Sequence, residues 1–129
     1  MAEIADFQIF WDKPSFDLTG TNTTFDISPQ LPANISPLAG GVVAFTVRVS
    51  ATNLGGGNPP PSTVSLTLLS NGKKIKTYPL KTGTLCSLVA FIHKEGQLKP
   101  GANSLQFQIP STVDVVTVSH VVLWFQRNI

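Results

Sequence analysis

The chain has 129 residues, of which 42% are hydrophobic, and this is enough for one domain with its own core over residues 1–129. Only 12% of the residues are charged and the formal net charge is +2, which is too small to imply nucleic-acid binding, since such binding normally requires a clustered basic face. A single cysteine excludes an intramolecular disulfide, and no apolar run reaches the roughly 18 residues of a membrane-spanning helix.

Turn residues divide the chain into short apolar segments, and none has a convincing helical period. In these segments β-branched and aromatic residues alternate with polar ones, as in half-buried strands. About eight strands are expected, with a short extended piece at 16–18 added to segments at residues 5–11, 24–27, 42–51, 63–69, 74–80, 84–92, 104–109 and 113–127. This spacing favours an all-β protein, an antiparallel two-sheet β-sandwich of jelly-roll type.

The connections carry their own signals. Residues 28–41 are rich in Pro and end in two glycines, so they predict a long irregular connection that crosses between sheets. Residues 53–62 are expected to form an exposed loop between neighbouring strands. Asn71-Gly72 predicts a tight hairpin, because a type I′ turn needs positive φ at both central residues. Four lysines are expected at this hairpin and along a protected edge strand, with a polyanion site as the alternative: Lys73, Lys74, Lys76 and Lys81.

The last strand, residues 113–127, changes register. In the first half, the apolar residues that alternate with polar ones are the even-numbered Val116 and Val118. In the second half they are odd-numbered: Val121, Leu123 and Phe125. A β-bulge near Ser119-His120 would turn both sets toward the core, because one extra residue flips every later side chain. Val122 and Trp124 would then lie on the outer face, where a soluble protein needs another sheet, a subunit or a ligand to cover them.

Two turn motifs in the second half point to a known family. Residues 70–73 read Ser-Asn-Gly-Lys, and residues 98–105 read Leu-Lys-Pro-Gly-Ala-Asn-Ser-Leu. In this order they resemble the C-terminal half of galactose-binding-like jelly rolls, the fold of many carbohydrate-binding modules and accessory domains of glycoside hydrolases and polysaccharide lyases. The resemblance covers about half of the chain and implies a jelly-roll fold that binds sugar. The first half departs from it, since the acidic calcium loop of some such modules is absent, and no sugar-binding residue can be carried across by position.

Catalytic signals are missing. The two histidines, His93 and His120, do not have the spacing of metal ligands, and His120 is expected to be a structural residue at the bulge. The acidic residues are scattered, and no nucleophile elbow, P-loop or dinucleotide fingerprint is present. Cys86 lies among apolar residues, as a buried thiol would. We therefore expect no enzyme activity, no metal and no cofactor.

Binding is the better prediction. Sugars stack on flat aromatic faces while amides and carboxylates bond their hydroxyls. Trp11 is expected in the core. The predicted ligand-binding residues are Trp124, Gln126, Asn53, Asn58, Asp12 and Tyr78.

Two functions follow. The first is a non-catalytic carbohydrate-binding, lectin-like module. The alternative is a structural assembly protein, a virion or appendage component that forms jelly-roll homo-oligomers through Val122 and Trp124. The turn motifs favour the first. The low charge favours the second, and so does the N-terminus, which shows no secretory signal and indicates either cytoplasmic synthesis or a removed leader. The sequence fixes no location, although its neutral polar composition is common in extracellular and virion proteins.

Overall fold

The computed structural model describes residues 3–8, 15–35, 40–51, 63–93, 97–110 and 114–128, and of residues 3–8, 51, 127 and 128 it describes the backbone alone. Within these ranges the chain forms eleven strands and no helix. The strands are β1 (Glu3–Gln8), β2 (Ser15–Leu18), β3 (Thr24–Ile27), β4 (Gln30–Leu31), β5 (Gly41–Ala51), β6 (Thr63–Ser70), β7 (Lys73–Lys81), β8 (Leu85–Ile92), β9 (Gly101–Ala102), β10 (Leu105–Gln108) and β11 (Asp114–Asn128).

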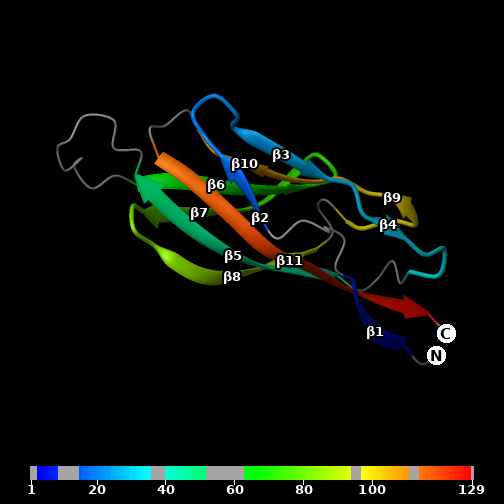
Figure 1. Ribbon diagram of the computed structural model, residues 1–129. Helices are drawn as coiled ribbons and strands as arrows, with labels where there is room; N and C mark the ends of the chain where they lie inside the picture. Colours follow the sequence, from blue (N-terminus) through cyan, green and yellow to red (C-terminus); the bar gives the residue numbers. More distant parts are fainter. Residues whose placement is uncertain are drawn as a thin grey trace.

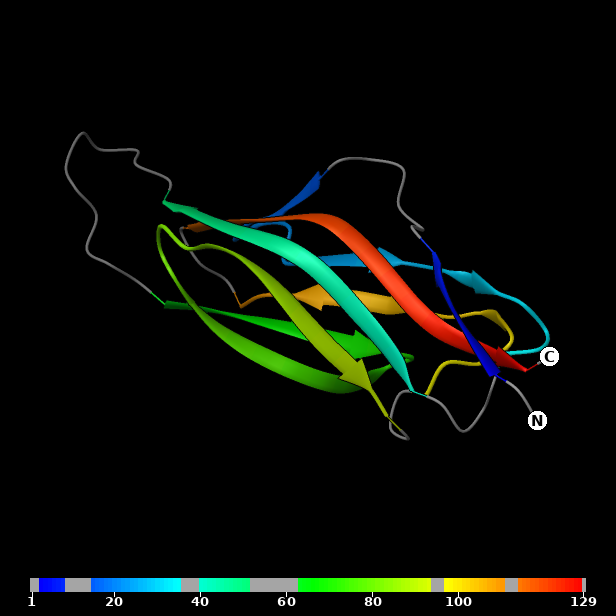
Figure 2. The same cartoon turned by 90° about the horizontal axis from the view of Figure 1, so that it is seen from below.

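Two antiparallel sheets pack face to face (Figures 1 and 2). In sheet A the order is β8, β5, β11, and both β1 and β2 pair with the far side of β11. In sheet B the order is β3, β10, β6, β7, while β4 and β9 form a small separate pair. From β2 onward each main strand is followed by one in the opposite sheet, except at the β6–β7 hairpin. This connectivity confirms the predicted jelly-roll sandwich, with extra short strands beyond the eight expected.

The predicted bulge in β11 is confirmed. Ser119 pairs with Thr46 and Val122 pairs with Ala44, so two residues of β11 lie opposite one residue of β5. His120 has a φ of 54°, in the left-handed region that histidine enters more readily than most side chains. The register change places the core-type residues on both sides of the bulge in the interior, namely Val116, Val118, Val121, Leu123 and Phe125.

The predicted hairpin is also confirmed. Asn71 and Gly72 have φ angles of 48° and 81°, as a type I′ turn requires. The following strand, β7, is the edge of sheet B, and it carries four exposed lysines together with the exposed Pro79. Charged side chains and proline both discourage another chain from pairing with an edge strand. The lysines therefore lie where the edge-protection interpretation placed them: Lys73, Lys74, Lys76 and Lys81.

Two expectations about the connections were wrong. Residues 30–31 form β4, which pairs with β9, so the connection expected to be irregular contains a short strand. Backbone pairing over only two residues leaves no periodic pattern in the sequence. β5 belongs to sheet A and β6 to sheet B, so the chain between them joins opposite sheets rather than neighbouring strands. Residues 52–62, which make this connection, lie outside the described part of the chain.

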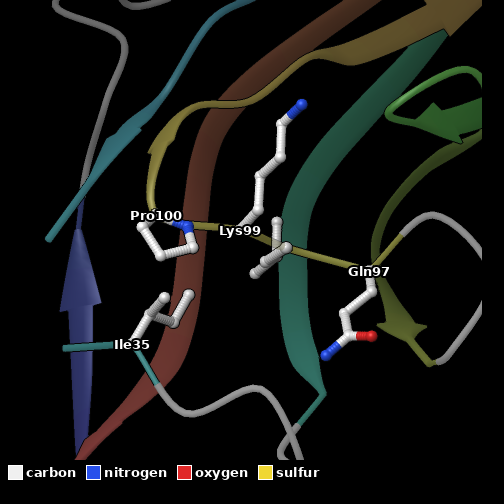
Figure 3. A pocket seen from close by; sticks show the side chains of 5 residues that line it. Ile35, Gln97, Lys99 and Pro100 are labelled. Atoms are coloured by element: carbon white, nitrogen blue, oxygen red, sulfur yellow. The ribbon is translucent and has the colours of Figure 1, made fainter. Parts of the chain in front are cut away.

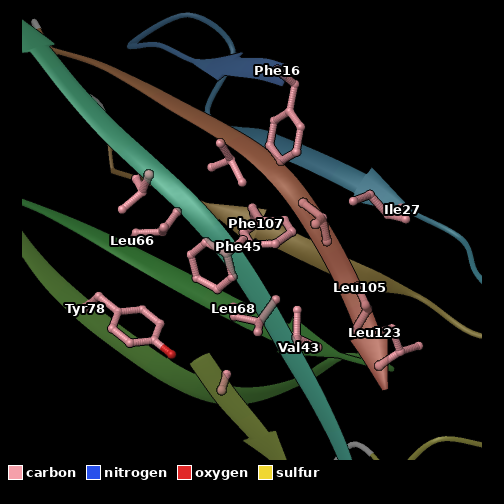
Figure 4. Close-up of a cluster of buried hydrophobic side chains, with 14 of the residues drawn as sticks. Phe16, Ile27, Val43, Phe45, Leu66, Leu68, Tyr78, Leu105, Phe107 and Leu123 are labelled. Carbon is pink, nitrogen blue, oxygen red and sulfur yellow. The ribbon is translucent and has the colours of Figure 1, made fainter. Parts of the chain in front are cut away.

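Aromatic rings join the two sheets in the core (Figure 4). Phe45 of β5 meets Phe107 of β10 and Tyr78 of β7 edge to face, at centroid distances of 5.1 Å and 5.8 Å. Phe16 and Phe25 stack at 4.0 Å near one side of this cluster. Edge-to-face and offset contacts are the favourable geometries of aromatic pairs. Both sheets therefore pack against one shared core through their inner faces, and their outer faces take no part in this packing.

Candidate functional site: the outer face of sheet A

Exposed apolar side chains gather on one face of the protein. Among the described residues, the large hydrophobic side chains that remain exposed are Leu85, Val89, Phe91 and Trp124, with exposed fractions of 68%, 46%, 59% and 38%. The first three lie on β8, where they alternate with residues packed against the core, and Trp124 lies on β11 between buried neighbours. All four therefore point to the outer side of sheet A, because alternate side chains leave a strand on opposite faces.

The register of sheet A aligns these residues in rows. Val42 of β5 pairs with Phe91 on one side and with Trp124 on the other, and the next outward row consists of Val89, Ala44 and Val122. Val42, Ala44 and Val122 are half-buried. We call this surface the apolar face, and its residues are Val42, Ala44, Leu85, Val89, Phe91, Val122 and Trp124.

The outer face of sheet B is different. Its side chains are mostly hydroxyls, amides and an acid, and several are bonded to one another across strands. Thr67 and Thr77 hydroxyls lie 3.1 Å apart, and the Gln106 amide donates to the Asp26 carboxylate at 2.7 Å. Alternation of buried and polar residues is the usual pattern of a sheet with one solvated face. Sheet B therefore presents a polar outer surface, whereas the outer surface of sheet A combines apolar rows with polar side chains such as Thr46, Ser87 and Arg48.

Two of the predicted ligand residues share the apolar side of sheet A. Trp124 is exposed there, and Gln126 follows it two residues later on the same face, half-buried. Val122, predicted as an interface residue, lies beside them. Trp11 and three other predicted residues, Asn53, Asn58 and Asp12, lie outside the described part of the chain.

Tyr78 does not belong to this surface. Its side chain is 8% exposed and packs edge to face on Phe45. Its hydroxyl donates a hydrogen bond of 2.8 Å to the backbone carbonyl of Val89 on β8. A buried ring with an occupied hydroxyl cannot stack on a sugar, so this placement removes Tyr78 from the predicted ligand-binding residues. The lysines near Tyr78 in the sequence indicated an exposed strand, whereas the Tyr78 ring faces the core.

Tyr78 gives a direct test of this placement, because it is the only tyrosine of the sequence. Burial raises the pKa of Tyr78 above its ordinary value of 10.0. The unfolded chain then loses this proton at a lower pH than the folded one, so stability is unaffected below pH 10 and falls as the pH rises from 10 toward the folded pKa. We expect the tyrosinate absorbance to appear above pH 10 in the folded protein, and at its ordinary position in denaturant. Titration at pH 10 or below in the folded protein would show an exposed hydroxyl.

The sequence reading missed the contribution of β8. The segment was predicted as an apolar strand, but Leu85, Val89 and Phe91 were not recognised as surface residues. A signal was present, since residues 85–92 are apolar in both alternating sets and contain no charge. A strand of that kind is covered on both faces, and in this structure only its inner face is covered by the described residues.

A pocket of about 310 Å³ lies at the end of the sandwich, lined by Ile35, Gln97, Leu98, Lys99 and Pro100 (Figure 3). None of the predicted ligand residues lines it. In Figure 3 the amine of Lys99 extends away from Ile35. The walls are chiefly apolar.

Two asparagines hold the wall of this pocket. Asn103 is buried, accepts from the Lys99 amide at 2.9 Å, and donates to the carbonyls of Lys99 and Gly101 at 2.8 Å and 3.1 Å. Asn71 donates to the Gln97 carbonyl at 2.9 Å and to the Asn103 side chain at 3.1 Å. The two turn motifs of the second half are therefore bonded to each other.

The described ranges contain neither a cluster of metal ligands nor a membrane-spanning helix. In these ranges no three His, Cys, Asp or Glu side chains gather where they could hold a metal ion. The same part of the chain has no helix with the length and apolar character needed to cross a bilayer. Cys86 is half-buried and packs against the core.

The fold and the apolar face define a jelly-roll β-sandwich whose sheet A carries exposed apolar side chains on its outer face. No protein-family model matches the sequence, and no curated protein sequence matches it. Among solved structures, the chain is similar to dimeric latent PorU from Porphyromonas gingivalis, with a TM-score of 0.66 and 15% sequence identity over 98% of this chain. The chain spans 13% of the length of that protein. At this identity the likeness supports the fold alone.

Proposed function

We propose that the protein is a non-catalytic structural assembly module, a jelly-roll domain of the kind that builds a virion or an appendage, and that it forms multimers through the apolar face. One observation carries this proposal: wherever the structure describes side-chain exposure, the large hydrophobic side chains that are exposed all lie on the outer side of sheet A. Contiguous exposed apolar patches mark interaction surfaces. Aliphatic members such as Leu85 and Val89 favour contact with protein, because sugars stack on aromatic planes.

The mass of the protein in solution tests this proposal. We expect light scattering to give a mass above that of one chain, and Trp124→Ala to lower the mass while thermal unfolding stays cooperative. Gln108→Ala, an exposed change on sheet B, is the matched control and should leave the mass unchanged. A wild-type protein that stays monomeric at every concentration would contradict the proposal.

Carbohydrate binding is the second candidate, and the spacing of two aromatic side chains favours it. Trp124 and Phe91 flank Val42 in one row, so their strands are about 10 Å apart. The Thr46 and Ser87 hydroxyls, 3.4 Å apart, lie further along the same face and could bond sugar hydroxyls. A glycan panel separates the two functions: saturable binding by a monomer, lost in Trp124→Ala, would favour the sugar and oppose assembly.

A further inference from the structure

We infer that the occupant of the apolar face is a second copy of this chain, docked face to face around a two-fold axis, so that Phe91 of each copy enters a trough above Ala44 of the other. This inference rests on the proposed assembly function and adds its partner, its stoichiometry and its contact residues.

The relief of the apolar face supplies the first argument. β5 runs between β8 and β11, and its outward residues in the apolar rows are the small Val42 and Ala44. The flanking strands carry larger side chains there, Phe91 on β8 and Trp124 on β11. Ala44 itself lies between Val89 and Val122 in the next row. These side-chain sizes imply a shallow trough along β5 between ridges on β8 and β11. An exposed phenylalanine ring fits such a trough better than it fits another ridge, since apolar surfaces bind by close packing.

Reciprocity supplies the second argument. The ridge residue Phe91 and the trough residue Ala44 lie on the same face of the same copy. A copy that inserts its ridge can therefore receive its partner's ridge at the same time, and two identical contacts form around one axis. Such an isologous interface closes after two copies, whereas a ridge and a trough on different faces would continue into a filament.

Charge supplies the third argument. The two central rows of the apolar face, from Phe91 to Trp124 and from Val89 to Val122, contain no charged side chain. The exposed Arg48 lies only at its margin, paired with Leu85, and His93 stacks on Phe91 at the other end. The lysine-rich strand β7 lies at the edge of sheet B. Two copies that met through β7 would instead bring eight lysines together, four from each chain. The same chain thus repels a copy at one surface and accepts it at the other.

The edge of β8 is a less suitable place for the second copy. The Thr84 carbonyl accepts from the Val49 amide of β5, so carbonyls of even-numbered residues at β8 face β5 and those of odd-numbered residues face the open edge. Val89 is odd-numbered, and its carbonyl already accepts from the Tyr78 hydroxyl. A strand added at this edge would compete with that bond. The face, rather than the edge, is left for the partner.

The area of the apolar face predicts how strong the pair is. Three strands span about 15 Å, and the distance along β8 from residue 85 to residue 91 is about 20 Å. Two such faces have a projected area of about 600 Å² in total, which is below the roughly 1,000 Å² of a strong specific interface. We therefore expect a reversible dimer that dissociates on dilution through the micromolar range.

Charge complementation between two variants tests the docking. By sedimentation equilibrium, Phe91→Lys alone and Ala44→Glu alone should each dimerise at least about tenfold more weakly than wild type. An equimolar mixture should regain dimers, because one contact then pairs Lys with Glu and the other keeps the original Phe and Ala. Gln108→Lys and Gln108→Glu on sheet B are the charge-matched controls and should dimerise like wild type. If Ala44→Glu fails to unfold cooperatively, the smaller Ala44→Asp replaces it at the same contact.

The outcomes separate this inference from the function on which it rests. A wild-type species larger than a dimer, dissolved by Phe91→Lys, would keep the assembly function and overturn the closed pair. A dimer that Phe91→Lys weakens but that the mixture does not restore would overturn the ridge-in-trough contact. A monomer at all concentrations, or a dimer indifferent to both variants, would overturn the inference together with assembly through the apolar face.

Discussion

Replacing Phe45 by Ala is expected to lower the free energy of unfolding by about 3–5 kcal/mol, the range for a phenylalanine removed from a packed core. Phe45 is 2% exposed and reaches from sheet A to the rings of Phe107 and Tyr78 in sheet B. Its removal takes away apolar burial and leaves a cavity at the contact between the sheets. Urea unfolding followed by circular dichroism measures the change.

Phe91→Ala is the matched control for this prediction, because it deletes the same side chain from the outer side of the same sheet. Measured at a concentration low enough to keep the protein monomeric, its effect should stay within about 1 kcal/mol, as for most surface substitutions. Equal losses of stability in the two variants would mean that Phe45 and Phe91 do not lie on the buried and the exposed face of sheet A, respectively.

Much of the fold could be predicted from residue patterns. In the last strand, the apolar positions change from even to odd numbers, which requires an extra residue near Ser119-His120. The structure has a bulge and a positive φ at this place. The reason is physical: side chains alternate strictly along a strand, so only a bulge brings both halves of β11 to the core. The Asn71-Gly72 turn was predictable for a similar reason, since few residues adopt positive φ at low cost.

Other features could not be predicted because they depend on contacts between distant segments. Residues 30–31 pair with β9, about seventy positions away, and two residues leave no periodic trace. Whether Leu85 or Leu88 faces solvent could not be decided from a segment that is apolar on both sides. This ambiguity affects the candidate site most. The alternation of residues along β11 predicted that Trp124 and Val122 face outward, whereas their neighbours on β8 are known only from the strand register of sheet A.

The turn motifs behind the family resemblance have a structural role in this chain. Asn71 of the first motif and Asn103 of the second are hydrogen-bonded, and together they hold the backbone of residues 97–101. These contacts explain why asparagine suits both turns, through its paired donor and acceptor. They concern the shape of a loop, so they support the jelly roll and say nothing about a ligand.

Asn103→Ala is expected to cost about 2–4 kcal/mol, because the buried amide completes several backbone bonds at once and each partner left without one carries a desolvation penalty. Its oxygen serves the Lys99 amide, and its nitrogen serves the carbonyls of Lys99 and Gly101. Part of the penalty is relieved by water, since Lys99 is exposed. Urea unfolding measures the loss, and hydrogen exchange should show the Lys99 amide opening well before the amides of β5.

Two further substitutions sharpen this last prediction. Asn103→Asp keeps the oxygen that accepts from Lys99 but sets a second oxygen against the two carbonyls, so it should cost as much as Ala or more. Asn22→Ala changes an exposed asparagine and should stay within about 0.5 kcal/mol of wild type. If Asn103→Ala behaved like Asn22→Ala, the loop would be held by its Pro-Gly backbone alone, and the bonds between the two motifs would contribute nothing to stability.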